Sequence, residues 1–150
     1  MKNLIVLGLL ATITLTGCTT NVVVEGSVPT PLVRKIPAQV GVYYDENFKS
    51  FRHSESLEAE GTWNIDLGDQ NVTFFRNLFG SLFDGVRELE TPEPAADAIA
   101  GLDALIIPRI EKYGFLTPSM SGLKFFSASI HYRITMVDIC LLYTSPSPRD

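Results

Sequence analysis

The sequence contains few of the side chains that most often carry out chemistry. It has two cysteines and two histidines in 150 residues. His53 and His131 lie far apart in polar segments, and no spacing typical of metal ligands recurs around them. We interpret both as solvated histidines and expect no metal and no cofactor. The alternative is a site that joins the two histidines to Asp or Glu carboxylates.

Sequence motifs of catalysis are also missing. There is no Gly-x-Ser-x-Gly, no convincing Ser/His/Asp order and no Gly-rich phosphate loop. Glu55, Glu58 and Glu60 form an acidic cluster beside His53, but a paired-carboxylate site needs one acid in a buried position. This segment is too polar to predict burial. We therefore expect no catalytic residues and no enzyme, with a hydrolase that uses His53 or His131 as the less favoured hypothesis.

An excess of positive charge is absent as well. The chain has 12 Lys and Arg against 17 Asp and Glu, for a formal net charge of −5. Nucleic acids and anionic headgroups select clusters of Lys and Arg. The composition therefore argues against nucleic acid as a partner.

The sequence does have a segment typical of bacterial secretion at its N-terminus. A short basic start, Met1–Asn3, precedes an apolar run over residues 4–16. This run is shorter than the roughly 20 residues that a membrane-spanning helix needs, and it suits the apolar region of a signal peptide. It ends in Leu15-Thr16-Gly17-Cys18. A buried N-terminal helix with a packed cysteine is the alternative.

The Leu15–Cys18 segment resembles the lipobox of bacterial lipoproteins. The resemblance implies cleavage between Gly17 and Cys18, a diacylglyceryl thioether on Cys18 and usually an acyl chain, such as palmitate, on the new amine. Two or three such chains hold a protein stably on a membrane, whereas one does so only marginally. Thr19 replaces the Asp that favours retention at the inner membrane. We expect an outer-membrane anchor facing the periplasm, with the inner membrane as the alternative.

Residues 140–150 resemble read-through of a sequencing adapter. A strand-like run breaks abruptly into Thr144-Ser145-Pro146-Ser147-Pro148. We interpret 140–150 as a non-native tail, in which case the native domain continues past about Ile139 and the chain is truncated. Cys140 would then be non-native, and with Cys18 acylated we expect no disulfide. The alternative is a genuine Ser/Pro tail.

Between the signal over 1–17 and this tail, the sequence predicts a tether followed by one domain. Residues 18–37 include Gly26, Pro29 and Pro31, which favour a flexible tether, with an edge strand at 22–24 as the alternative. Residues 38–139 have the patterning of a single α+β domain.

Within this domain, apolar positions that alternate or cluster predict strands over 39–45, 62–67, 86–89, 105–110 and 124–137. Residues 51–58 predict an exposed strand or loop. The even-numbered positions from Phe126 to Met136 predict one dry face on a long hairpin that turns at 116–122. Together these elements predict a mostly antiparallel sheet backed by one Phe-rich helix.

Apolar spacings of three and four predict that helix over 70–84, with Asp69 as its N-cap and Gly85 as its C-terminal stop. Its four phenylalanines are Phe74, Phe75, Phe79 and Phe83. We interpret them as a broad face packed under the sheet. The alternative is that Phe74 or Phe83 is exposed and docks a partner or a lipid tail, on a surface that Tyr43, Tyr44 and Trp63 would extend.

The layout of residues 38–138 is similar to small periplasmic α+β domains of uncharacterised proteobacterial lipoproteins, and more remotely to auxiliary lipoproteins of envelope transport and assembly systems. The segments that carry this likeness are Val40–Tyr44 and Gly61–Gly68. The resemblance implies a non-enzymatic, lipid-anchored module that acts through contacts with an envelope protein. The alternative is a periplasmic module that binds a lipid or another apolar ligand between helix and sheet.

Overall fold

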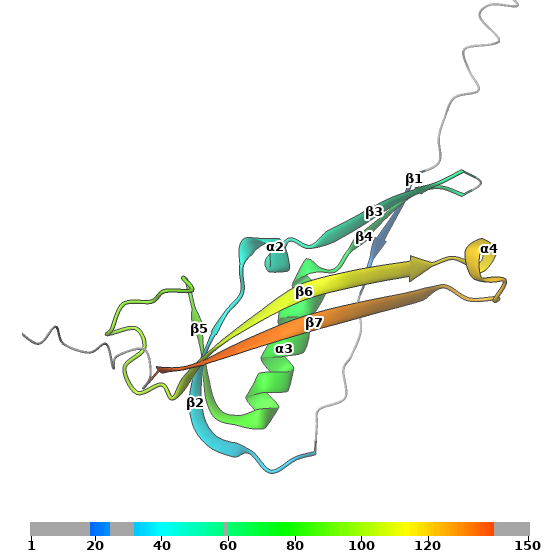
Figure 1. The fold of residues 1–150 in the computed structure, drawn as a ribbon. Coiled ribbons are helices and arrows are strands. Elements are labelled where there is room, and N and C mark those ends of the chain that lie inside the picture. Colours follow the sequence, from blue (N-terminus) through cyan, green and yellow to red (C-terminus); the bar gives the residue numbers. More distant parts are fainter. Residues whose placement is uncertain (1–18, 25–31, 59, 140–150) are drawn as a thin grey trace, which may run out of the picture.

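The computed structural model describes residues 19–24, 32–58 and 60–139 (Figure 1). The elements, in chain order, are β1 (Thr19–Val23), β2 (Ile36–Tyr43), α2 (Glu46–Lys49), β3 (Arg52–Leu57), β4 (Gly61–Asp66), α3 (Gly68–Leu82), β5 (Phe83–Leu89), β6 (Ala104–Leu116), α4 (Pro118–Ser121) and β7 (Ser127–Asp138). The α+β class predicted from the sequence is confirmed.

The strands form two mixed sheets, of order β1-β4-β3 and β5-β2-β6-β7. β1 runs parallel to β4, and β2 runs parallel to both β5 and β6. β3–β4 and β6–β7 are antiparallel hairpins. β2 pairs with β6 only from Ala104 to Ile106, whereas the β6–β7 hairpin continues to Leu116. The hairpin thus extends far beyond the strands beside it, and the three-stranded sheet lies against its outer half.

The main core lies between α3 and the four-stranded sheet. Val40, Val42 and Ile106 point to one face of the sheet, and each is at most 1% exposed. Phe75 and Phe79 of α3 pack against them and are 1% and 3% exposed. Full burial of such side chains stabilises a fold by about 1.5–3 kcal/mol each. The prediction of a Phe-rich helix face under a sheet is confirmed.

The ends of this helix differ from the prediction. α3 begins at Gly68, two residues early, with Leu67 in the N-cap position and no side-chain cap. The N-cap assignment of Asp69 is therefore wrong, and Asp69 lies in the first turn, where its charge favours the helix dipole. A Cβ on Gly68 would lie 1.9 Å from the carbonyl oxygen of Lys49, so α3 starts where only glycine allows the close approach to α2.

At its other end α3 stops at Leu82, and the chain passes directly into β5. Phe83 is extended, donates its N–H to the carbonyl oxygen of Phe79 and is only 7% exposed. The stop assigned to Gly85 is wrong, because burial of Phe83 in the core favours the extended conformation two residues earlier. Gly85 lies inside β5, paired with Gln39.

The β6–β7 hairpin confirms the strands predicted over 105–110 and 124–137, although β6 continues to Leu116. Its register shifts between Ile110 and Lys112, so that Tyr113 and Phe115 remain on the same face as Ile110. Pro108 lies beyond the pairing of β6 with β2, at a free edge of β6, as its missing N–H requires.

The dry face predicted for β7 is interrupted. Ile130 and Tyr132 are half-buried, but Ile134 and Met136 are 47% and 58% exposed. The covering side chains contact Tyr132: Phe48 of α2 and Phe75 of α3 lie against its ring. Phe126 and Ala128, at the start of this face, are exposed as well, so the prediction holds only for Ile130 and Tyr132.

A smaller cluster covers the opposite face of the four-stranded sheet. It consists of Leu89, Ile99, Leu102, Leu105 and Ile139. The segment 90–103 supplies two of these side chains and consists of turns and bends.

The tether predicted over 18–37 is wrong for its first part. Thr19–Val23 form β1, which pairs with Thr62–Asp66 of β4, and β2 already begins at Ile36. β1 is an edge strand, but it starts three residues before the alternative of 22–24. In the part of the chain described here, no helix is long and apolar enough to cross a membrane.

Candidate functional site

The two histidines do not meet. His53 lies on β3, with its ring 4.5 Å from that of Tyr113 and its Nε2 3.2 Å from Oε2 of Glu55. His131 lies on β7 and pairs with Lys112 of β6. The next pair along the hairpin is Tyr113–Ile130, and successive residues of a strand point to opposite faces. His131 therefore lies on the face of the hairpin opposite to Tyr113 and His53. Its side chain is exposed, as predicted. His53 is half-buried, so its assignment as a solvated residue is wrong: the aromatic ring of Tyr113 covers it.

The acidic cluster beside His53 also disperses in the fold. Glu58 is exposed in the β3–β4 turn, and Glu60 accepts hydrogen bonds from the hydroxyls of Thr117 and Ser119. Among residues 19–24, 32–58 and 60–139, no three His, Cys, Asp or Glu side chains lie close enough to hold a metal ion.

Two half-buried tyrosines near these groups, Tyr113 and Tyr132, are held in their neutral form. Burial, helped by the charge of Glu55, raises the pKa of Tyr113. Burial also raises the pKa of Tyr132, whose hydroxyl donates to Oδ1 of Asn71 at 2.7 Å. Asn71 is 2% exposed and lies on α3, so this bond joins helix and hairpin inside the core. The bond to Asn71 gives the Tyr132 hydroxyl a structural role, and the ring of Tyr113 packs against the rings of Phe51 and His53.

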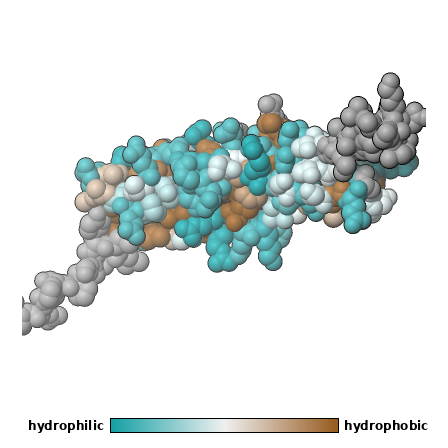
Figure 2. Space-filling model, turned by 90° about the horizontal axis from the view of Figure 1, so that it is seen from above, coloured by the Kyte–Doolittle hydropathy of each residue, from teal (hydrophilic) through white to brown (hydrophobic). Residues whose placement is uncertain are grey.

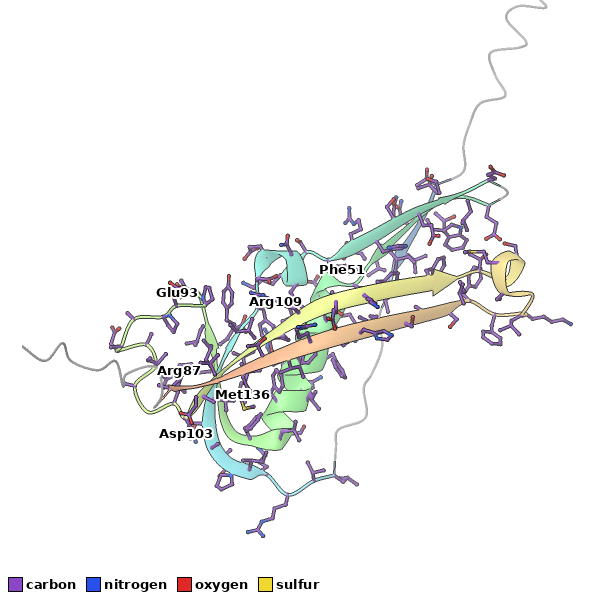
Figure 3. All side chains as sticks on the ribbon, viewed as in Figure 1. Phe51, Arg87, Glu93, Asp103, Arg109 and Met136 are labelled. Carbon is purple, nitrogen blue, oxygen red and sulfur yellow. The ribbon has the colours of Figure 1, made fainter. Side chains whose placement is uncertain are left out.

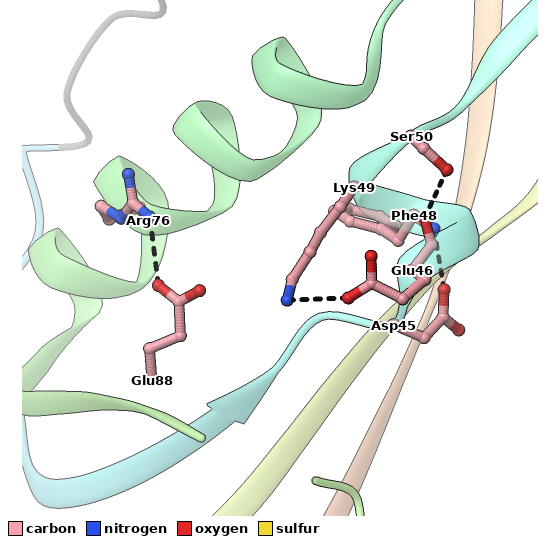
Figure 4. A network of polar contacts seen from close by, with 7 residues as sticks. All are labelled: Asp45, Glu46, Phe48, Lys49, Ser50, Arg76 and Glu88. Atoms are coloured by element: carbon pink, nitrogen blue, oxygen red, sulfur yellow. Dashed lines mark hydrogen bonds and ion pairs between the residues drawn. The ribbon is translucent and has the colours of Figure 1, made fainter. Parts of the chain in front are cut away.

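A surface pocket of about 510 Å³ lies between α2 and β6. Asp45, Phe51 and Arg109 contribute to its wall, and Figure 3 labels Phe51 and Arg109 there. Arg109 Nε lies 3.7 Å from Oδ2 of Asp45. Asp45 also caps α2 by accepting the N–H of Phe48 at 2.7 Å (Figure 4). The same view shows Arg76 of α3 bonded to Glu88 of β5 at 3.0 Å. These charged groups hold elements together.

The aromatic surface considered from the sequence is mostly core. Phe83 is buried, and Phe74 packs against the rings of Phe75 and Tyr132. Tyr44 is 2% exposed, and burial, with the charge of Glu88, raises its pKa to about 12. The alternative of an exposed Phe83 is therefore wrong.

The exposed aromatics lie instead at the end of the hairpin. We name residues Leu116–Phe126 the hairpin tip; it contains α4 and the connection to β7. Its large apolar side chains are 46–57% exposed, and they are Leu116, Met120, Leu123, Phe125 and Phe126. The sequence carries a signal for this surface, because Lys124 is the only charged residue in the segment.

A second exposed apolar strip lies on β7. Ile134 and Met136 have no charged residue between them or beside Met136, and among described strands β7 pairs only with β6 (Figure 3). We name residues 134–137 the β7 edge. Arg133 and Asp138 flank this strip on β7, whereas on β5, the seven-residue strand at the opposite edge, Asp84, Arg87 and Glu88 leave no uncharged run of that length. Charges of this kind discourage pairing with another strand.

Gly17 and Cys18, the predicted cleavage and lipidation residues, lie outside the described residues, as do the signal over 1–17 and the tail over 140–150. Comparison with protein-family models, with curated proteins and with solved structures found no match to this chain.

Proposed function

We propose that this protein is a non-enzymatic lipoprotein of the cell envelope, anchored through acylated Cys18 and acting by protein contacts in envelope assembly or transport. The observation that carries the proposal is the Leu15–Cys18 segment directly before a folded strand. Thr19 favours the outer membrane, with the domain in the periplasm.

The β7 edge is the proposed surface for the protein partner. A strand that pairs on one side presents unpaired N–H and C=O groups, which a strand of another protein can use. Ile134 and Met136 add exposed apolar area beside these groups. Both exposed side chains lie on the β7 edge, and residues 134–137 include no charged residue.

The fold gives less support to a ligand between helix and sheet. Phe75, Phe79 and Ile106 fill that space and are at most 3% exposed. A lipid tail would have to displace them, at a cost similar to creating a cavity. Protein contact is therefore the preferred function.

The partner surface is tested by affinity capture from solubilised envelopes, followed by identification of bound proteins and lipids. Ile134→Lys with Met136→Lys should lose the specific partner, because lysines on an edge strand oppose strand addition. Val86→Lys on β5 is the matched control, since Val86 is an exposed apolar residue at the other sheet edge. Equal capture by both variants would contradict the surface, and co-purified lipid without a protein partner would favour the binding module.

The anchor is tested separately. Cys18→Ser should abolish incorporation of labelled palmitate and leave the precursor uncleaved. Normal acylation of this variant would refute the proposed anchor.

A further inference from the structure

The hairpin tip and the start of β1 lie at the same end of the molecule. Thr19 pairs with Thr62, next to the β3–β4 turn. Glu60 of that turn accepts a hydrogen bond from Thr117 in the tip at 3.0 Å. Figure 1 shows the start of β1, the β3–β4 turn and α4 together at one extremity of an elongated body.

A second set of contacts ties β1 to the tip. Thr20 pairs with Trp63 of β4, and the ring of Trp63 lies 5.1 Å from that of Phe126 and 5.7 Å from that of Phe115. Only one strand, β4, therefore separates the first residues of the domain from the aromatic side chains of the tip.

Thr19, the first residue of β1, directly follows the proposed acylation site in the sequence. One residue of chain spans about 3.8 Å. An acyl anchor attached at that point would therefore hold the bilayer surface close to the end of the molecule that carries the tip.

The tip itself has the composition of a membrane-docking surface. Its apolar side chains are about half exposed, and its single charge, Lys124, has the sign that anionic headgroups attract. Exposed Glu58 in the neighbouring turn offsets this charge, so burial of apolar area must supply the attraction. Figure 2 shows that, in contrast to this apolar tip, hydrophilic residues cover much of the body of the molecule.

We propose that the hairpin tip docks into the lipid surface that holds the acyl chains of Cys18. This inference depends on the lipid anchor proposed above. Docking at two points, acyl chains and tip, fixes the orientation of the domain, with α3 and the part of the sheet that contains β2 and β5 at the end away from the bilayer. Its consequence is that the β7 edge is presented at a set distance from the membrane.

Trp63 is the only tryptophan and provides a built-in probe. The mature acylated protein is reconstituted in phosphatidylcholine vesicles that carry a nitroxide on the acyl chain near the headgroup. We expect co-sedimentation with the vesicles and strong quenching of Trp63 fluorescence. The variant Leu123→Ser with Phe125→Ser, which leaves the ring neighbours of Trp63 intact, should lose most of the quenching but still co-sediment.

The matched control is Ile134→Ser with Met136→Ser, which removes exposed apolar side chains away from the tip and should keep full quenching. Co-sedimentation without quenching of the unchanged protein would overturn docking and leave the anchor standing. Failure of the acylated protein to co-sediment would overturn both. A dimer that depends on Leu123 and Phe125, with quenching insensitive to them, would identify a second copy as the occupant and also overturn the inference.

Discussion

The two ends of this molecule use aromatic side chains in opposite ways. At the α3 end, Phe75, Phe79 and Phe83 are at most 7% exposed and close a core over the four-stranded sheet. At the tip, Phe125 and Phe126 are 57% and 53% exposed. The difference teaches that one end is organised for stability and the other for contact with something outside the chain.

The largest expected effect comes from truncating a ring at each end. Phe75→Ala should lower the free energy of unfolding by about 3–5 kcal/mol, because it leaves a cavity in a filled core. Phe125→Ala, at an exposed position, should change it by no more than about 0.5 kcal/mol. Urea denaturation of both variants measures the contrast. Similar losses at the two sites would contradict the division into core and contact ends.

The next effect concerns the polar bond inside the core. Asn71→Ala should cost about 1–3 kcal/mol, because the buried hydroxyl of Tyr132 loses its acceptor. Tyr132→Phe should cost less than Asn71→Ala, and the double variant less than the sum of the two. A double-mutant cycle by thermal or urea unfolding measures this coupling. Additive losses would show that the two side chains act independently.

A smaller effect should stabilise the α3 end. Gly80 is exposed in the helix, and a Cβ there would meet no atom within 4 Å. Gly80→Ala should therefore raise the free energy of unfolding by about 0.5–1 kcal/mol. Gly68→Ala is the control and should destabilise, because its Cβ would clash with the backbone of Lys49. Equal effects of the two substitutions would contradict the packing described between α2 and α3.

The smallest expected effect belongs to the three-stranded sheet near the tip. The side-chain hydrogen bond from Arg52, at 2.6 Å, lowers the pKa of Asp66. Because the folded pKa is lowered, the carboxylate stabilises the fold above its unfolded pKa, and this contribution is lost as pH falls through the folded pKa. Arg52→Ala should raise the pKa of Asp66 towards its ordinary value in an NMR titration. An unchanged titration would show that this exposed pair has no effect in solution.

Periodicity in the sequence was enough to predict α3, because Phe75 and Phe79 face one core. It also predicted the β6–β7 hairpin, whose apolar alternation continues beyond that core. It did not predict β1, since Thr19-Thr20-Asn21 has no apolar alternation. That strand depends on pairing with β4, helped by the hydrogen bond from Asn64 to Asn21 at 3.0 Å. Such tertiary pairing leaves no local pattern to read.

The split into two sheets and the exposure of the tip were also beyond sequence reasoning. Both follow from the length of the β6–β7 hairpin beyond its pairing with β2. That length depends on which residues of β6 pair with β2, and local sequence does not specify this register. Phe125 and Phe126 lie in the connection before β7, where no helix covers them, and are exposed, unlike the phenylalanines of α3. The run of eleven residues with one charge, 116–126, was a signal that could have been used.

The most direct test of the account is mass spectrometry of the N-terminus of the protein extracted from bacterial membranes. We predict a mature chain that begins at Cys18 and carries a diacylglyceryl thioether and an acylated amine. An unmodified soluble chain that still begins at Met1 would contradict the anchor, and with it the orientation that places the hairpin tip against the bilayer.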